Sequence, residues 1–395
     1  MKLTETLQVK RSGELSKLCH LAKNLYNLAN WYYRQDFFTL HSYLSYYDLD
    51  FILKDKEAYR ALPSQTSQQV LKLVVRNWKS YFKALKEYKV NACKFRAKPK
   101  IPNYKKKNGE SIAIFTNQQC RIKDGRLNFP KSVNLRPIKT RIEGKIREVR
   151  VVPLGIAYKI EIVHEKAEMD LRLHKSNILS LDLGLNNLTT AVNNKGLKPF
   201  VVKGKVLKSI NQYYNKQLAC YQSMENLKGN FCDTKRIQKL RVKRNNKIND
   251  IFHKLSRAII EYSKENDLGT IVIGYNERWK QNVNLGKKTN QNFVQVPFSN
   301  LVQKIKYKAT LVGTRVILQE ESYTSKCSFL DNEPIEKRDS HAGIRISRGL
   351  FRSSNGTIIN ADINASYNIM KKAVPNSIAE DGIEGVGLHP LLVAI

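Results

Sequence analysis

The chain of 395 residues is 42% hydrophobic and is long enough for two or three domains, each with its own core. It has no run of 18 apolar residues, which excludes a membrane-spanning helix, and its first residues lack the apolar stretch of a signal peptide, so we expect a cytoplasmic protein. Lys and Arg number 69 against 34 Asp and Glu, a formal net charge of +35. An excess this large and this widely spread favours a nucleic acid over a membrane surface as the partner.

The first ninety residues have the pattern of a strand followed by helices. Residues 2–10 alternate weakly between apolar and polar side chains, which is typical of a strand. Apolar residues recur at helical spacing from Leu15 to Ala29 and again from Val70 to Leu85, after a start signal at Pro63. A stretch rich in Tyr and Phe separates the two runs, and we expect most of these rings in a core. The sequence therefore predicts a helical domain at residues 11–92.

A basic segment follows, in which seven of the fourteen residues 94–107 are Lys or Arg. Two prolines exclude a regular helix there. The segment is a solvated loop at least, and Phe95 and Tyr104 among the charges favour a loop that contacts phosphates. The candidate contacts are Lys94, Arg96, Lys98 and Lys105.

Residues 111–163 contain short β-type runs separated by turn residues such as Asp124-Gly125. Together with residues 2–10, these runs could close a small β-barrel. The fold class that we predict for the first half is thus a barrel, formed by residues 1–10 and 93–176, that carries the helical domain as an insertion.

The apolar run from Ile178 to Leu181 ends at a single carboxylate, Asp182, before a turn at Gly184 and Asn186-Asn187. An ionised Asp in a buried strand is costly unless something pairs with it, which favours a metal ligand. The alternative is an Asp that caps the turn. Two further β-type runs, at residues 188–192 and 199–202, complete a predicted meander.

Helical and β-type runs then alternate to the end of the chain. A long helical region is predicted at about residues 205–265, strands at 270–274 and 315–321, and helices at 298–312 and from about 360. Asp362 is near the start of the last helix, where a carboxylate is favoured. The long helical region carries Arg241, Arg244 and Lys247, which we interpret as a face along a nucleic-acid backbone rather than a merely solvated face.

The order β-β-β-α-β-α-β-α, with Asp182 on the first strand and Asp362 on the last helix, is the layout of RNase H-like nucleases. Hydrolysis of a phosphodiester needs charge neutralisation and an activated water, and two divalent ions held by carboxylates supply both. Oxygen ligands suit Mg²⁺. We expect Asp182 to bridge two Mg²⁺ ions and Asp362 to hold one of them.

A third acid is expected at the end of the fourth strand, but Gly274 stands there. The candidates are Glu277 beyond that strand and Glu320 and Glu321 at the end of the fifth. Two strand spacings put a Glu on the fifth strand about 10 Å from Asp182, which a side chain and a shared metal can bridge. We prefer Glu321 to Glu320, and both to Glu277. The alternative for the glutamate pair is ordinary solvation of a strand end.

The six cysteines are scattered, and no two form a Cys-x-x-Cys pair. This spacing predicts neither a disulfide framework nor a zinc site. They are Cys19, Cys93, Cys120, Cys220, Cys232 and Cys327.

Three strings make the chain similar to the TnpB-type (OrfB) proteins of bacterial insertion sequences, transposon relatives of the type V CRISPR effectors. They run from Ile178 to Gly184, from Tyr323 to Ser328 and from Asn360 to Ala365. The resemblance implies a wedge-type β-barrel, a helical recognition domain and a RuvC (RNase H-like) nuclease domain at residues 177–395. It also implies a guide RNA from the transposon end and a target DNA selected by pairing, while the protein reads a short motif beside the target. We expect a monomer on one RNA, associated with the nucleoid when it is bound to DNA.

The chain departs from this family at two places. Most relatives carry a four-cysteine zinc ribbon between the second and third strings, whereas only Cys327 is present here. We therefore expect no zinc and a metal-free insertion at about residues 326–358, with Arg345, Arg348 and Arg352.

The second departure is Gly274 in place of the catalytic Glu. Either the acid has moved, and the chain is an RNA-guided, Mg²⁺-dependent endonuclease that cuts double-stranded DNA beside a target-adjacent motif, or it is a nuclease-dead, RNA-guided DNA-binding repressor. We favour the nuclease, and a DNA-joining transposase is a weaker third possibility.

Overall fold

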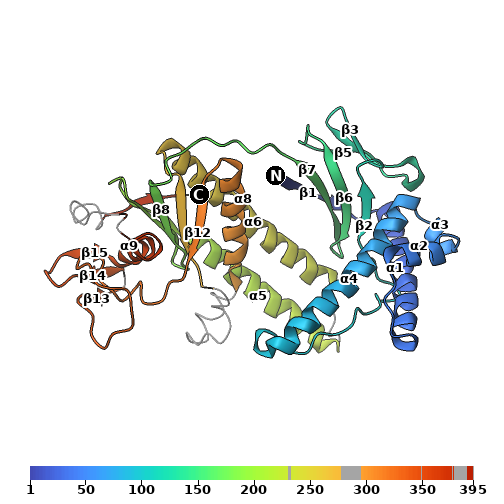
Figure 1. Cartoon of the computed structure of the whole chain (residues 1–395), viewed down its shortest axis with the longest axis horizontal. Helices are drawn as coiled ribbons and strands as arrows, with labels where there is room; N and C mark the ends of the chain where they lie inside the picture. Colours follow the sequence, from blue (N-terminus) through green and yellow to red (C-terminus); the bar gives the residue numbers. More distant parts are fainter. Residues whose placement is uncertain (230–232, 277–294, 348, 376, 378–388, 395) are drawn as a thin grey trace. The chain divides into compact units, whose positions relative to one another are not determined.

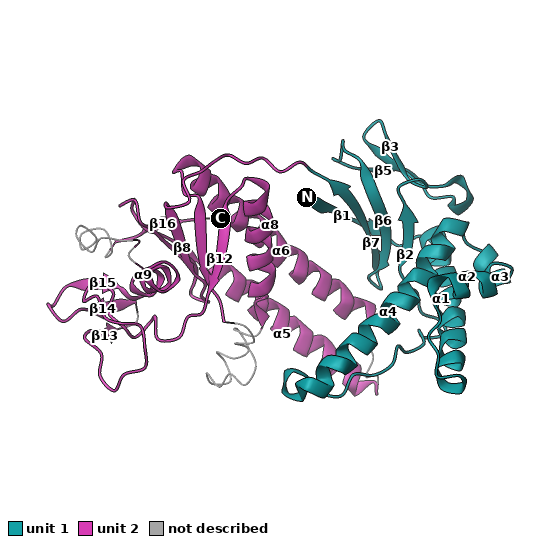
Figure 2. Cartoon of the chain, in the orientation of Figure 1, with its two compact units in different colours: residues 1–166 teal, residues 167–395 magenta. Residues whose placement is uncertain are grey.

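The computed structural model describes residues 1–229, 233–276, 295–347, 349–375, 377 and 389–394. The chain divides into two compact units, unit 1 at residues 1–166 and unit 2 at residues 167–395 (Figures 1 and 2). Among the helices of the described residues, none combines the length and the apolar character that a membrane crossing needs.

Unit 1 contains the two long helices that the apolar spacing predicted. The first, α1, begins where the Ser12 hydroxyl accepts a hydrogen bond from the Leu15 amide, which satisfies one of the donors left open at a helix start. Trp78 of the second, α4, is fully buried, stacks on Tyr33 with 4.5 Å between ring centroids, and donates its indole N–H to Asn30. The helices are α1 (Gly13–Thr39), α2 (Tyr46–Leu53), α3 (Glu57–Arg60) and α4 (Ser64–Val90).

The strands of unit 1 form two antiparallel sheets. One has the order β1-β7-β6-β2, and the other has the order β3-β4-β5. A closed barrel is not confirmed, because β1 and β2 are the two edges of the first sheet, and it stays a prediction. The strands are β1 (Lys2–Lys10), β2 (Ala113–Thr116), β3 (Arg121–Lys123), β4 (Arg126–Asn128), β5 (Ile138–Lys139), β6 (Ile146–Pro153) and β7 (Ala157–Glu165).

One hydrophobic core in unit 1 contains side chains from both the helices and the strands. Leu25 and Trp78 of the helices belong to the same buried cluster as Phe115 and Val149 of the first sheet. The finer division of this unit into a barrel and a helical recognition domain therefore stays a prediction.

Unit 2 is built on a mixed six-stranded sheet with the order β12-β11-β8-β9-β10-β16. Strands β8, β11 and β12 run parallel, and β8, β9 and β10 form the predicted meander. The order of elements along this unit agrees with the prediction, with the edge strand β16 in addition. The strands are β8 (Ile178–Asp182), β9 (Asn187–Asn193), β10 (Phe200–Lys203), β11 (Thr270–Gly274), β12 (Arg315–Gln319) and β16 (Leu391–Val393).

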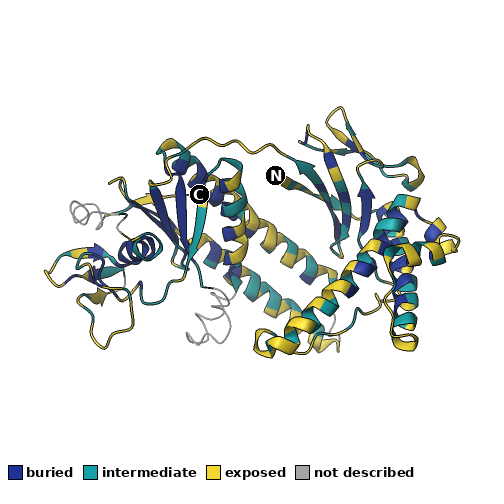
Figure 3. Ribbon diagram, in the orientation of Figure 1, coloured by how far each residue is buried: buried dark blue, intermediate teal, exposed yellow. Residues whose placement is uncertain are grey.

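Helices cover both faces of this sheet, and the period of two along a strand decides which side chains meet which helix (Figure 1). Leu179 and Leu181 of β8 belong to a core with α6 and α8, whereas Ile178 belongs to a second core with α9. Strands β8 and β11 are buried on both faces as a result (Figure 3). The helices are α5 (Lys205–Leu227), α6 (Lys235–Glu265), α8 (Phe298–Leu311) and α9 (Ala361–Ala373).

The expected insertion between β12 and α9 is present. Residues 320–343 have no regular helix or strand, and a small antiparallel sheet of β13 (Ile344–Ser347), β14 (Leu350–Arg352) and β15 (Ile358–Asn360) follows. Strand β15 leads directly into α9. Arg348 lies outside the described residues.

Substitution of Trp78 by Ala removes a large buried ring and leaves Asn30 without its indole donor. We expect a loss of about 3–5 kcal/mol in the free energy of unfolding, measured by chemical denaturation of the full chain followed by circular dichroism. The control is Tyr47→Ala, whose side chain is 78% exposed and whose loss is expected to change that free energy by no more than about 0.5 kcal/mol. Equal effects of the two substitutions would contradict the packing described here.

Candidate active site

Asp182 and Asp362 are brought to the same place by a pair of serines that joins β8 to α9. Ser180 is two residues from Asp182 and shares its face of the strand, while Ser366 is four residues from Asp362 and shares its face of the helix. The Ser180 hydroxyl donates to the Ser366 carbonyl at 2.8 Å, and the Ser366 hydroxyl donates to the Ser180 carbonyl at 3.2 Å. Both serines are fully buried, so their small side chains let the helix approach the strand closely. This pairing fixes the register of α9 on β8.

Asp362 is half-buried in the first turn of α9, which begins where the Asn360 side chain accepts hydrogen bonds from the Asp362 and Ile363 amides. Its Oδ2 accepts a hydrogen bond of 2.5 Å from the side-chain amide of Asn187, at the start of β9. Its Oδ1 is 4.0 Å from the guanidinium of Arg345.

A pocket of about 350 Å³ opens beside this carboxylate. Lys203 and Arg345 contribute positive charge to its lining. The pocket is lined by Asn186, Asn187, Lys203, Arg345, Gly349, Leu350, Asn360 and Asp362.

Gly274 lies at the end of β11, the strand between Asp182 on β8 and the Glu320-Glu321 pair that follows β12. A Cβ built on Gly274 would collide with the Glu321 carboxylate and would be 3.0 Å from Glu321 Cγ and 2.6 Å from Ile369 Cδ1 of α9. Real Cβ atoms essentially never come that close. The Glu321 side chain therefore occupies the space where a side chain at position 274 would begin.

Contacts on both sides hold Glu321 in this position, just beyond the strand end at Gln319. The Glu321 amide donates to Asn276 Oδ1 at 2.9 Å, and Asn276 Nδ2 donates to Glu321 Oε2 at 3.4 Å. The Thr324 hydroxyl and amide both donate to the Glu321 carbonyl, at 2.8 and 3.2 Å. The turn that begins the second sequence string thus positions this acid.

The electrostatics of Asp182 and Glu321 are those of carboxylates crowded together away from water. Burial, and next the Asp362 carboxylate, raise the pKa of Asp182 to about 7. Burial, and next the Asp182 carboxylate, raise the pKa of Glu321 to about 8. In addition, Glu321 Oε1 is buried and has no hydrogen-bond partner among the described residues.

A buried carboxylate oxygen with no donor, near Asp182, which in turn lies near Asp362, has the chemistry of a hard divalent cation site. A cation there would relieve both the lost hydration and the mutual repulsion that raise these pKa values. The oxygen donors of Asp182, Glu321 and Asp362 thus fit Mg²⁺.

The two alternates for the third acid differ from Glu321. Glu320 is exposed, its carboxylate is 2.5 Å from the Lys372 ammonium, and that hydrogen bond is the main cause that lowers its pKa. Its side chain also accepts a hydrogen bond from the Ser322 amide, so it is engaged at the surface. Glu277 lies outside the described residues.

The predicted nucleic-acid contacts of unit 1 all lie at exposed positions, and two of them have partners within the unit. Lys94 pairs with Glu87 at 2.6 Å. The Lys105 ammonium lies over the Tyr26 ring, 5.0 Å from its centroid, while Asn27 holds the Lys105 backbone. Arg96 and Lys98 are exposed, and their role stays a prediction.

The predicted contacts on α6 fall into two kinds. Arg244 is half-buried, and its guanidinium donates to Asn211 of α5 at 2.9 Å and to the Gln295 carbonyl at 2.6 Å, so it braces the unit internally. Burial lowers the pKa of Arg244. Arg241 pairs with Asp233 at 2.7 Å on the surface, and Lys247 is exposed.

Sequence reasoning did not identify the amides that position the acids. Asn187 belongs to the Asn186-Asn187 turn, which was read only as a turn, and Asn276 follows the strand end at Gly274. Both amides lie at or just beyond a strand end at the sheet edge where the acids lie. This position is the sequence feature that could have identified them. The structure also places Arg345 of the insertion beside Asp362, a contact that no pattern in the sequence predicts.

Two family models match the chain. One is OrfB_IS605, described as "Probable transposase", over residues 161–280, and the other is "Cas12f1-like, TNB domain", over residues 298–369. The first match spans Asp182 and Gly274, and the second spans Glu321, Asp362 and the insertion.

Among curated proteins, the chain is similar to a "CRISPR-associated endodeoxyribonuclease Cas12f2" from a Micrarchaeota archaeon, with 26% identity over 56% of this chain and 41% of the relative. It is also similar to a "TnpB-like protein ORF457" from Acidianus two-tailed virus, with 25% identity over 58% of this chain and 49% of the relative. Each match spans less than half of the relative's length.

Among solved structures, the fold is similar to that of the protein in "Cryo-EM structure of the Cas12f1-sgRNA-target DNA complex". The TM-score is 0.57, with 14% identity, and the match covers 91% of this chain and 82% of the other. Both family models and the TnpB-like and Cas12f relatives thus make the chain similar to the TnpB-type relatives of the type V CRISPR effectors.

Proposed function

We propose that the chain is an RNA-guided, Mg²⁺-dependent DNA endonuclease, encoded by a transposable element, that cuts double-stranded DNA beside a short target-adjacent motif. The observation that carries this proposal is the position of Glu321. Its carboxylate fills the space beside Gly274, on the sheet face that also carries Asp182 and next to the helix that carries Asp362. This position supports a RuvC-type site of three acids that needs no acid on β11.

In the proposed site each side chain has a separate role. Asp182 would contact both Mg²⁺ ions, while Glu321 and Asp362 would each contact one. Bound Mg²⁺ supplies charge neutralisation at the scissile phosphate and a more acidic water. Asn276 orients the Glu321 carboxylate, and Asn187 orients that of Asp362, each by an amide donor to the oxygen that faces it. Lys203 and Arg345 line the pocket beside Asp362 and can pair with phosphate oxygens of the strand that is cut.

The proposed partners are a guide RNA from the transposon end and a target DNA. The net charge of +35 supports two polyanionic partners, and the Cas12f1 of similar fold is named in its structure with an sgRNA and a target DNA. Unit 1 would read the short motif beside the target, with one protein on one RNA in the cytoplasm.

The nuclease-dead repressor is the weaker alternative. A binding protein has no need of buried carboxylates that repel one another, as Asp182 repels Asp362 and Glu321, whereas a metal-dependent nuclease does. Two of them retain raised pKa values that a divalent cation would reverse.

The first test compares Glu321→Gln with Glu320→Gln. The chain is purified with the RNA bound to it, that RNA is sequenced, and cleavage of a matching plasmid with a randomised flank is measured in Mg²⁺. We expect Glu321→Gln to slow cleavage by at least about 100-fold, because loss of a metal ligand removes several kcal/mol of transition-state stabilisation. Glu320→Gln, its exposed neighbour, keeps the wild-type rate within about threefold.

A carboxylate returned to β11 is the complementary control. Gly274→Glu alone places a Cβ against Glu321 and Ile369, so we expect it to be inactive or unstable. In the double variant Gly274→Glu with Glu321→Gly, the space now filled by the Glu321 side chain is free, and β11 supplies the acid. Partial recovery of cleavage in the double variant, relative to Glu321→Gly, is expected. Full activity of Glu321→Gln would show that the third ligand is elsewhere.

The raised pKa values also predict how stability depends on pH without metal. The folded protein holds protons on Asp182 and Glu321 up to about pH 7 and 8, whereas the ordinary values are 3.8 and 4.5. Between these limits the folded state binds more protons than the unfolded state, so the free energy of unfolding falls as pH rises.

The measurement is the melting temperature of Asp182→Asn minus that of wild type, in EDTA, from pH 4.5 to 8.5. The variant cannot ionise at position 182, so we expect the difference to be small near pH 4.5 and to reach several degrees by pH 8.5. Excess Mg²⁺ should reduce the difference at high pH by stabilising wild type. Asp250→Asn, on the exposed side of α6, controls for charge loss. A difference that does not change with pH would contradict the burial of Asp182 among carboxylates.

A further inference from the structure

The segment 320–343 buries several of its side chains without the help of regular secondary structure. It consists of turns and bends between β12 and β13, yet Cys327 is fully buried and Glu333 is 4% exposed. A segment of this kind has few backbone hydrogen bonds to hold it, so its side chains must supply the order.

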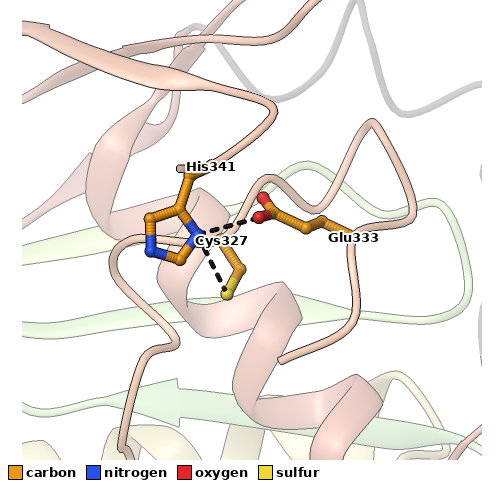
Figure 4. Close-up of side chains that lie close together, drawn as sticks. All are labelled: Cys327, Glu333 and His341. Atoms are coloured by element: carbon orange, nitrogen blue, oxygen red, sulfur yellow. Dashed lines mark hydrogen bonds and ion pairs between the residues drawn. The ribbon is translucent and has the colours of Figure 1, made fainter. Parts of the chain in front are cut away.

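Three side chains of this segment converge on one point. The ligand atoms of Cys327, Glu333 and His341 all lie within 4.8 Å of one another. The His341 Nδ1 atom is 2.8 Å from Glu333 Oε1 and 3.8 Å from Cys327 Sγ. In Figure 4 the same ring nitrogen of His341 faces both partners, while the other ring nitrogen points away from them.

The spacing of these donors is close to that of a tetrahedral zinc site. With bonds of about 2.3 Å to sulfur and about 2.0–2.1 Å to nitrogen and oxygen, tetrahedral donors are about 3.4–3.6 Å apart. The observed sulfur–nitrogen distance is 3.8 Å. The Glu333–His341 pair would separate by about 0.6 Å to admit the ion, which is a small side-chain movement.

The charges of the cluster also favour a cation. Glu333 is a buried acid whose other oxygen accepts a hydrogen bond of 2.7 Å from the Ser328 amide, and the Cys327 thiol and the His341 imidazole lie beside its first oxygen, with the exposed Arg338 guanidinium as a further charged neighbour. Two positive charges would balance one thiolate and one carboxylate, with a neutral imidazole as the third ligand.

Other contacts hold the ligands in place, as the outer contacts of protein metal sites do. The Cys327 carbonyl accepts hydrogen bonds of 2.9 Å from Asn364 and 2.8 Å from Asn368, both buried on α9. The side chain of His341 is 17% exposed, so solvent can reach the fourth position of a tetrahedral ion there.

We propose that Cys327, Glu333 and His341 bind one Zn²⁺ ion, with water as the fourth ligand, and that the ion fastens segment 320–343 to α9. The missing cysteine pair led the sequence to predict a metal-free insertion. The three donors come from positions with no zinc-ribbon spacing, and only the folded segment brings them together.

The test measures zinc directly on the full chain. The purified protein is incubated with ZnCl₂, desalted and analysed by inductively coupled plasma mass spectrometry, with about one zinc per chain expected. Cys327→Ser, Glu333→Gln and His341→Ala should each lower the content at least about fivefold. Cys120→Ser, another buried cysteine, and Asp182→Asn, in the proposed Mg²⁺ site, should keep the wild-type content.

Cobalt gives a readout that identifies the ligand. Co²⁺ added to the zinc-free chain should produce a thiolate-to-metal charge-transfer band in wild type and Cys120→Ser but not in Cys327→Ser. Zn²⁺ should raise the melting temperature of wild type and leave that of Glu333→Gln and His341→Ala unchanged.

A wild-type chain that retains no more zinc than the folded Glu333→Gln variant, or a cobalt spectrum without the thiolate band, overturns the proposal. Circular dichroism verifies that each variant is folded, and Glu333→Gln, which keeps the shape of the side chain, decides the matter if Cys327→Ser does not fold. Zinc content does not depend on cleavage, so the outcome is separate from that of the proposed nuclease.

Discussion

The contact between the Glu321 carboxylate and the bare backbone of Gly274 is the constraint on which the site in unit 2 depends. A Cβ at position 274 would collide with Glu321 in its present rotamer. Glycine at the end of β11 is therefore required for the glutamate that follows β12 to occupy this space. The exchange brings Glu321 close enough to Asp182 for the Asp182 carboxylate to add to the effect of burial and raise the pKa of Glu321, while burial and Asp362 raise that of Asp182. In the proposed site, divalent cations neutralise the carboxylates and relieve their repulsion, which favours binding of the cations.

Helix α9 connects the parts of this site through a series of buried polar side chains at alternate positions. Asp362 is followed by Asn364, Ser366 and Asn368, all three of which are fully buried. Ser366 binds β8, whereas Asn368 donates to the carbonyls of Thr324 and Cys327, in the turn that holds Glu321. The side-chain amides and the hydroxyl of these three residues have specific partners, although Asn368 Oδ1 has none among the described residues, and these contacts favour one register of the helix. The proposed zinc ion would fasten the same turn from its other end.

The sequence predicts most helices and strands of unit 2. Strands buried on both faces are continuous apolar runs, and the residues at the start of α9 are typical of a helix N-terminus. The positions of the two aspartates in those elements indicate a site, whereas the apolar pattern does not by itself distinguish Glu321 from Glu320. Contacts made through folded backbone could not be read in this way. The collision at Gly274, the amide of Asn276 and the meeting of Cys327 with His341 involve residues far apart in sequence or joined by irregular turns. The closed barrel of unit 1 was predicted from short strands, whose pairing the pattern does not determine.

A crystal structure with Mn²⁺ bound would show whether Glu321 is the third acid of a two-metal site. Anomalous scattering locates Mn²⁺ independently of any cleavage assay. The account predicts two peaks about 3.5–4 Å apart, with Asp182 between them and with Glu321 and Asp362 each bound to one ion. Ions held by Asp182 and Asp362 while Glu321 points away, or no ion at this edge of the sheet, would contradict it.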